Sequence, residues 1–85
     1  MDSYKDFKEK LDRVHKWPTT YMFKFVVPSA KVQEFTLLFS KETLDTKPSK
    51  NGNYVAFTMK KLVKSSDEVV DIYIAAKNIK GLMAL

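Results

Sequence analysis

The chain contains no cysteine, only two glycines and a single arginine. The absence of cysteine excludes a disulfide framework, thiolate metal sites and a cysteine nucleophile, and it fits a reducing compartment. No apolar run approaches the roughly 20 residues that a membrane-spanning helix requires. The first residues, MDSYKDFKEK, are too charged for a signal peptide. We therefore expect a soluble, cytoplasmic protein.

The net charge is positive, but lysine carries almost all of the positive charge. Lys and Arg together number 15 against 10 Asp and Glu, which gives +5, and Arg13 is the one arginine. The planar guanidinium of arginine suits bidentate readout of bases and phosphates, whereas a lysine ammonium is a hydrated point charge. The charge therefore favours a role in solubility over a dedicated nucleic-acid surface.

Hydrophobic periodicity predicts one small domain with a helical arm before it. A length of 85 residues, 45% of them hydrophobic, is enough for a single core. Pro18 ends the arm, and Pro28 with Ser29 ends the first strand and can cap a helix. The predicted elements are a helix over 3–15, a strand over 21–27, a helix over 30–41, a weak strand over 42–48, a strand over 54–63, a helix from the capping box at 65–68 to about Lys77, and a strand within 78–85.

The order of these elements after the arm is strand, helix, strand, strand, helix, strand. This is the split βαβ order of a ferredoxin-like α+β sandwich. Right-handed crossovers then place two helices on one face of a four-stranded antiparallel sheet. We divide the chain into an N-terminal helical arm, residues 1–16, and a ferredoxin-like domain, residues 17–85.

The other face of the predicted sheet has no helix to cover it. Strand alternation places apolar and lysine side chains together on that face, which is a natural surface for a partner. The residues predicted to face outward are Met22, Lys24, Val26, Tyr54, Ala56, Thr58, Lys60, Leu82 and Ala84.

The stretch PSKNGNY, residues 48–54, is the most distinctive in the chain. Asn51-Gly52 is a strong signal for a tight hairpin turn of the primed type, in which both central residues have positive φ. A P-loop is excluded because it needs two glycines and leads into a helix, whereas here one glycine leads into a strand. A weaker hypothesis remains that Lys47, Ser49 and Lys50 bind an anion.

RNA-recognition domains share the predicted topology, so their third-strand signature can be compared with this stretch. The matching positions are Lys50, Tyr54, Val55 and Phe57. Gly52 stands where the signature has an exposed aromatic residue, and Met22 and Lys24 face outward on the first strand in place of a stacking ring. Because base stacking supplies much of the affinity for single strands, nucleic-acid binding is the second hypothesis and not the first.

Catalytic chemistry finds little support in the sequence. His15 is the only histidine, lies in the arm, and has no partner group that the sequence places beside it. The carboxylates are scattered, and no hydrolase, metalloprotease or metal-ligand spacing is present. We expect no enzymatic activity, no catalytic residue, no metal site and no cofactor.

Four motifs carry a resemblance to a known family. They are W-P-x-x-Y-x-F-K at 17–24, P-S-x-x-G-N-Y at 48–54, S-x-x-E-V-x-x-I-Y at 65–73, and the terminal L-M-A-L. From Trp17 to Leu85 the chain resembles the bacterial proteins grouped as domain of unknown function 493, the YbeD-like family. The 48–54 motif is the specific one. Ala84 departs from the family, in which a bulkier valine is usual.

The resemblance implies a ferredoxin-like domain similar to ACT regulatory domains, with no established enzymatic activity and no catalytic residues to carry over. A link to lipoate metabolism is suggested for some members. The first hypothesis is therefore a non-catalytic regulatory or interaction module. We expect it to bind a small effector or a protein partner through the sheet face or the 48–54 loop, and a homodimer is one form this could take. The candidate binding residues are Pro48, Ser49, Lys50, Gly52, Asn53, Tyr54, Lys24 and Lys60.

Overall fold

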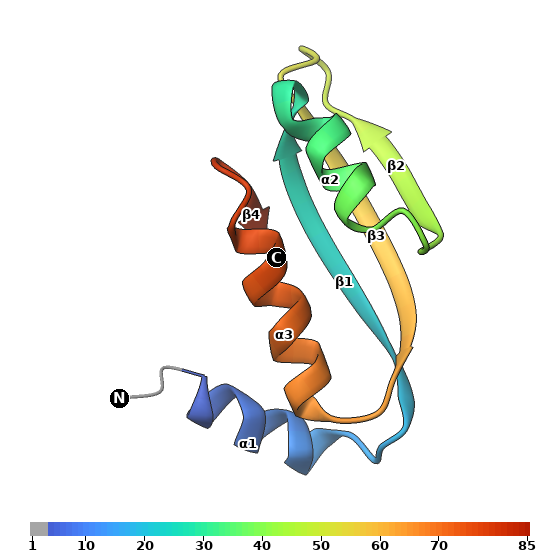
Figure 1. Cartoon of the computed structure of the whole chain (residues 1–85), viewed down its shortest axis with the longest axis vertical. Helices are drawn as coiled ribbons and strands as arrows, with labels where there is room; N and C mark the ends of the chain where they lie inside the picture. Colours follow the sequence, from blue (N-terminus) through green and yellow to red (C-terminus); the bar gives the residue numbers. More distant parts are fainter. Residues whose placement is uncertain (1–3) are drawn as a thin grey trace.

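The structure, a computed structural model, describes residues 4–85 and has the expected α+β architecture (Figure 1). Residues 1–3 of the predicted arm lie outside the described residues. The elements are α1 (Lys5–Val14), β1 (Thr19–Pro28), a 3-10 turn (Ser29–Lys31), α2 (Val32–Leu38), β2 (Leu44–Pro48), β3 (Tyr54–Val63), α3 (Ser66–Lys77) and β4 (Met83–Ala84).

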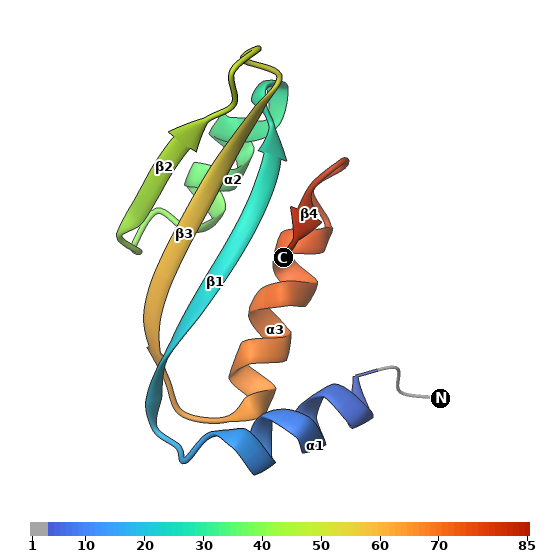
Figure 2. The same ribbon diagram turned by 180° about the vertical axis from the view of Figure 1, so that it is seen from behind.

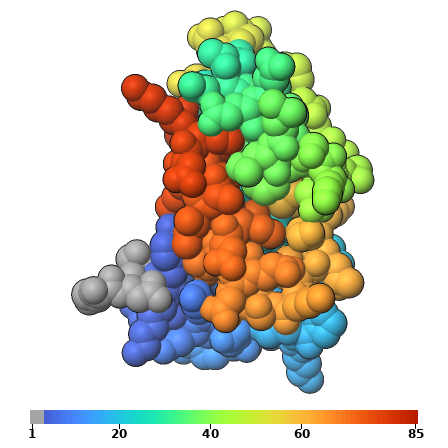
Figure 3. All heavy atoms as spheres, viewed as in Figure 1, coloured from blue at the N-terminus to red at the C-terminus, as the bar shows by residue number. Residues whose placement is uncertain are grey.

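The four strands form one antiparallel sheet in the order β2-β3-β1-β4. Helix α2 lies in front of the strands in Figure 1 and behind them in Figure 2. Helix α3 stands beside β1 in both views and buries Val69, Tyr73 and Ala76 in the same core. With all atoms drawn, the two helices and the residues after α3 cover most of the sheet on their side (Figure 3). The ferredoxin-like prediction is confirmed.

The core lies between the helices and the central pair of strands, β1 and β3. Every residue of β1 pairs with one of β3, so the two strands alternate in phase over their whole length. On the helix side Phe23, Phe25, Phe57 and Met59 are buried, as their spacing predicts. The rings of Phe35 in α2 and Phe57 stack with 4.5 Å between centroids, which fixes α2 on the sheet.

The predicted capping box begins α3, with one change. The Ser65 hydroxyl accepts a hydrogen bond from the Glu68 amide at 3.3 Å, as expected for an N-cap. The Glu68 carboxylate, however, accepts from the amide of Lys64 and not from that of Ser65. Both bonds satisfy amides at the start of the helix, and α3 ends at Lys77 as predicted.

The last strand differs from the prediction in length and in phase. It has only two residues, and Ala84 pairs with Phe25 while Met83 pairs with Val26. Leu82 and Ala84 therefore face the helices and pack against the core. Their predicted place on the uncovered face is wrong, and Met83 occupies that face instead.

A turn after α3 sets this phase. Gly81 has φ 83°, a backbone conformation that favours glycine, and the Leu82 amide donates to the Ile79 carbonyl at 3.2 Å. Because of this turn, the residues of β4 pair with β1 one position out of phase with the predicted strand over 78–85, so their side chains point to the opposite faces. Sequence alternation alone cannot count residues across such a turn.

The first sheet-packing helix is shorter than the predicted 30–41. A 3-10 turn precedes it, and α2 itself ends at Leu38. Ser29 does not cap this helix, because its hydroxyl donates to the Gly52 carbonyl. Leu38, which the predicted apolar stripe includes, is 46% exposed, whereas Phe35 and Phe39 are buried as expected.

The arm helix α1 packs against α3, as its apolar spacing predicts. Leu11 is buried, and the Phe7 ring lies 5.8 Å from that of Tyr73. An ion pair of 2.9 Å joins Lys8 to Asp67 at the start of α3. These contacts set α1 across one end of the sheet, where it borders a pocket described below.

Candidate functional site

The uncovered face of the sheet is hollowed at its centre. Ala56 and Thr58 of β3 present short side chains there, because they lie on the face opposite the core. Lys24 of β1 pairs with Thr58 on one side, and Asp45 and Lys47 of β2 pair with Thr58 and Ala56 on the other. Longer side chains thus flank shorter ones, and the hollow has a volume of about 260 Å³.

Large apolar side chains surround this hollow and are exposed. Leu85 shares this face because its amide donates to the Lys24 carbonyl, which places the two residues opposite one another. The exposed fractions are 43% for Tyr54, 50% for Met22, 51% for Met83, 64% for Leu62 and 74% for Leu85. We call this set, with the hollow and its flanking residues, the open sheet face.

The charge of the open sheet face is positive. Lys24, Lys47 and Lys60 lie on it with one acidic side chain, that of Asp45. Among residues 4–85 none of these four makes an ion pair. The face therefore combines an apolar surface with three ammonium groups that are available to a partner's carboxylates.

The candidate residues Lys24, Lys60 and Tyr54 all lie on this face, with Lys24 and Lys60 as diagonal neighbours and Tyr54 apart from them. Tyr54 and Lys60 are six residues apart on one strand, or about 20 Å at 3.3 Å per residue. Tyr54 pairs with Pro28 at the far end of β1. The structure thus brings the two lysines near one another and leaves Tyr54 at the other end of the strands.

The 48–54 loop is held by its own hydrogen bonds. The Ser49 amide donates to the Tyr54 carbonyl at 2.9 Å, and the Gly52 amide donates to the Ser49 carbonyl at 3.1 Å. The Tyr54 amide donates to Ser49 Oγ at 3.2 Å, and the Asn53 amide donates to Asn51 Oδ1 at 3.3 Å. Because these four amides are used within the loop, they do not form a cradle for an anion.

The turn type differs from the prediction. Only Gly52, with φ 73°, has positive φ in this loop, so Asn51 does not adopt the conformation that a primed two-residue turn requires. Five residues, 49–53, connect β2 to β3. Pro48 pairs with Val55 at the end of the edge strand, and Lys50 is exposed at the tip of the loop.

The structure adds residues to the site that the sequence prediction omitted. Leu62 continues the alternation of β3 and could have been found from that pattern alone. Asp45 and Lys47 needed the pairing of β2, and Met83 and Leu85 needed the phase of β4. Neither of these registers is visible in a single sequence.

The family model described as "Protein of unknown function (DUF493)" matches residues 12–85. The chain belongs to this family. The match begins within α1 and includes the whole sheet, α2 and α3 of this DUF493 protein. Searches of the curated proteins and of the solved structures found no significant match.

The DUF493 description assigns no activity, so the chemistry of the site has to be argued from its residues. Within residues 4–85 no three His, Cys, Asp or Glu side chains gather as metal ligands would. His15 is half-buried, with its ring 5.5 Å from that of Trp17 and 5.6 Å from that of Tyr21. No helix in the described part of the chain is both long and apolar enough to cross a bilayer.

Proposed function

We propose that this DUF493 protein is a non-catalytic interaction module that binds a protein partner on the open sheet face and regulates that partner by binding. The observation that carries the proposal is the exposure of Met22, Leu62, Met83 and Leu85 on one face, each by half or more. Monomeric proteins rarely expose a large continuous apolar patch without a partner for it.

The geometry suits a protein surface better than a small enclosed ligand. The hollow of about 260 Å³ lies on the face of the sheet and not inside the core. Fully burying one large apolar side chain contributes roughly 1.5–3 kcal/mol. Four half-exposed side chains therefore supply several such contributions, which can offset the entropy cost of association.

The charges describe the partner. Lys24, Lys47 and Lys60 outnumber the single carboxylate of Asp45, so the complementary surface is apolar at its centre and carries Asp or Glu at its edge. Binding by such a surface weakens as salt is added, but it is not abolished, because the apolar contacts are not screened.

The test uses two double variants with matched chemistry. M22E with M83E places two carboxylates on the open sheet face, and L37E with I74E places two on exposed positions of α2 and α3. Affinity-tagged wild-type protein and both variants are recovered from cells of the source organism, and the copurified proteins are compared by quantitative mass spectrometry. We expect a protein that the first variant loses at least tenfold and that the second retains.

Retention of every copurified protein by M22E/M83E contradicts the proposal, provided both variants melt within a few degrees of wild type. Sedimentation of the purified protein identifies a second copy as the partner if the wild type forms a dimer that M22E/M83E does not. A thermal-shift panel of amino acids, nucleotides and lipoate tests the small-effector form of the hypothesis. A shift that M22E/M83E removes favours an effector on this face.

The salt dependence of oligonucleotide binding and its dependence on Tyr54 distinguish the nucleic-acid hypothesis from the protein-partner hypothesis. Tyr54 is the only aromatic side chain on the open sheet face among the described residues, so a stacking mode depends on it. Binding of labelled oligonucleotides that persists at high salt and is lost in Tyr54→Ala favours nucleic acid. Binding that collapses with salt and ignores Tyr54→Ala is electrostatic only.

A further inference from the structure

The β4 edge of the sheet is incomplete. Strand β1 has ten residues, but β4 pairs only with Phe25 and Val26, and Leu85 adds one bond to the Lys24 carbonyl at 2.9 Å. Figure 2 shows β1 continuing beyond the end of β4 toward α1, with β3 on one side and no strand on the other. Within residues 4–85, the half of β1 that begins at Thr19 therefore has no strand paired on this side and forms an edge.

The backbone groups that face this edge follow from the register. The amide and carbonyl of one residue point to the same side of an antiparallel strand, and the side alternates with each residue. Since the Lys24 carbonyl bonds to Leu85, the backbone groups of Met22 and Thr20 point to the same edge. Within residues 4–85 neither has a backbone partner there.

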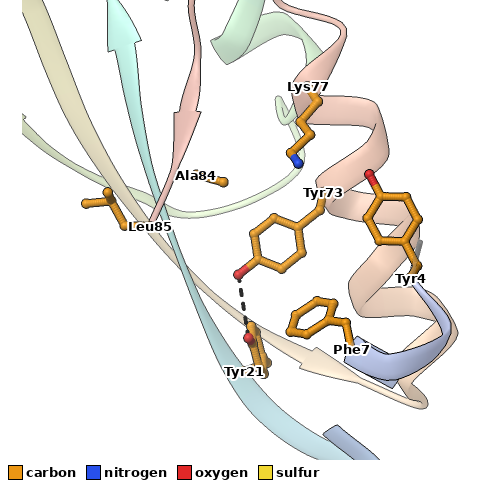
Figure 4. Close-up of a pocket in the computed structure, with 7 residues that line it drawn as sticks. All are labelled: Tyr4, Phe7, Tyr21, Tyr73, Lys77, Ala84 and Leu85. Carbon is orange, nitrogen blue, oxygen red and sulfur yellow. Dashed lines mark hydrogen bonds between the residues drawn. The ribbon is translucent and has the colours of Figure 1, made fainter. Parts of the chain in front are cut away.

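A pocket of about 410 Å³ lies directly beside this edge, on the helix side of the sheet. In Figure 4, Tyr21, Phe7 and Tyr73 form one wall, and Ala84 and Leu85 lie across the space from them. The hydroxyls of Tyr21 and Tyr73 are 3.5 Å apart, which holds the two rings in place.

Lys77 has the only charged side chain among the described residues that line the pocket. Its ammonium lies 6.0 Å from the centre of the Tyr4 ring. Burial, and then the hydrogen bond with Tyr21, raises the pKa of Tyr73, so its hydroxyl stays neutral in the physiological range. The pocket is therefore aromatic, with a single cation at its border.

We propose that an extended peptide segment of a partner protein pairs with β1 at Thr20 and Met22 as an additional strand. The edge offers the unpaired backbone N–H and C=O groups of Thr20 and Met22. Another backbone in extended conformation can bond to both residues at once. Alternate side chains of such a strand point to the helix side, so one apolar side chain enters the pocket. A carboxylate on that same side of the peptide pairs with Lys77.

A second copy of this chain fits the edge poorly. Two antiparallel β1 strands paired through Thr20 and Met22 would place Pro18 of the second copy opposite Lys24. Leu85 already occupies that position, and proline has no amide to donate. A short, separate peptide avoids both conflicts.

The two proposals share Met22 and Leu85 but use different groups of the molecule. Strand addition uses the backbone of β1 and the pocket beside α3, whereas the proposed function uses side chains on the other face of the sheet. The M22E/M83E variant tests that face, and the experiment below tests the edge, so either proposal can fail without the other.

The probes are blocked hexapeptides on a synthetic array. Position 4 carries Phe, Leu or Thr, and position 2 carries Glu, Thr or Lys. In an extended peptide these two side chains point to the same side. We expect binding to favour Phe or Leu over Thr at position 4 and Glu over Lys at position 2. Absence of any binding at millimolar peptide overturns the proposal.

Backbone N-methylation of the strongest-binding peptide then tests strand pairing without altering the protein. Methyl groups are placed on one amide at a time. A strand turns alternate amides toward its neighbour. A methyl group on an amide that points to β1 should therefore weaken binding more than tenfold, and a methyl group on an amide that points away should change it less than twofold. Equal effects at all positions overturn strand addition.

Two protein variants locate the site. Thr20→Pro removes one edge amide that does not take part in the β1–β3 ladder, so the sheet should persist while peptide binding is lost. Lys77→Gln should weaken binding of the peptide with Glu at position 2 severalfold and leave binding of the peptide with Thr at that position unchanged. The matched control Lys80→Gln should affect binding of neither peptide. Peptide-induced shifts of the Thr20 and Tyr73 amide signals in NMR support the site, and shifts confined to the open sheet face overturn it.

Discussion

The two faces of the β1–β3 pair are made by alternate residues of the same two strands, yet they differ in burial. Phe23, Phe25 and Phe57 face the helices and are at most 2% exposed. Their neighbours Met22 and Lys24 face away and are exposed. The difference shows which apolar residues the core needs. The methionines and leucines of the open sheet face are not among them, so they are available for binding.

The largest expected effect breaks the buried face. Phe25 contacts the rings of Phe23, Phe35, Phe39 and Tyr73, so Phe25→Ala should lower the free energy of unfolding by about 3–5 kcal/mol. Met22→Ala, three positions earlier on the other face, should change it by less than about 0.5 kcal/mol. Urea denaturation followed by circular dichroism measures both. Similar losses would mean that the open sheet face is covered in the isolated protein.

The turn that sets the phase of β4 gives the next effect. Gly52 and Gly81 both have positive φ, but a Cβ on Gly81 would lie 2.9 Å from Cγ of Pro28, whereas a Cβ on Gly52 meets no atom within 4 Å. Gly52→Ala should cost roughly 1 kcal/mol from backbone strain alone. Gly81→Ala should cost more, about 2–3 kcal/mol, because contact with the proline ring is added. Equal midpoints in urea would contradict this packing.

Removing the N-cap of α3 destabilises the helix that covers the buried face. Ser65→Ala removes the acceptor for the Glu68 amide and should cost about 1 kcal/mol. Ser65→Asp keeps an acceptor at that position and should stay near wild type. Thermal unfolding of the three proteins decides this. If the alanine and aspartate variants melt together, the hydroxyl does not cap the helix.

The smallest effect concerns a charged residue on the helix side of β3. Lys61 donates to Glu42 at 2.8 Å, and this hydrogen bond raises the pKa of the Lys61 ammonium above 10.5. A raised lysine pKa means that the folded protein holds this proton more tightly, so the stabilisation is full below about pH 10 and is lost as pH rises through the folded value. Glu42→Gln should cost about 0.2–1 kcal/mol at pH 7.

The control for this pair is the pH dependence. The difference in unfolding free energy between wild type and Glu42→Gln should be constant from pH 7 to 9 and should shrink toward pH 12. Lys24→Gln, on the open sheet face, should show no such trend because Lys24 makes no ion pair with any residue of 4–85. A difference that grows at high pH would reverse the assigned direction.

Much of the candidate site could be predicted from the sequence because a strand alternates its side chains with a period of two. Lys24, Lys60 and Tyr54 follow from that period alone and face outward as expected. The same period supplies Leu62, which was not included in the predicted face. Within a single strand, local geometry decides the face, and no distant residue is needed.

The rest depended on contacts between segments far apart in the chain. The positive φ of Gly81 and the pairing of Met83 with Val26 exchanged the predicted faces of the last strand. The hydrogen bonds of Ser49 occupy its own amide and those of Gly52 and Tyr54, and the sequence pattern does not show these bonds. Each depends on how a turn delivers the chain to its neighbour.

The sequence by itself determined the order of the elements, the ferredoxin-like topology and the inward side of the central strands, because periodicity and capping are local properties. Only the tertiary structure decided the register of β4 on β1, and with it the faces of Met83 and Ala84 and the pocket beside Tyr73. Strand register depends on turn geometry and on the packing of both partners, and neither is encoded in the pattern of one strand.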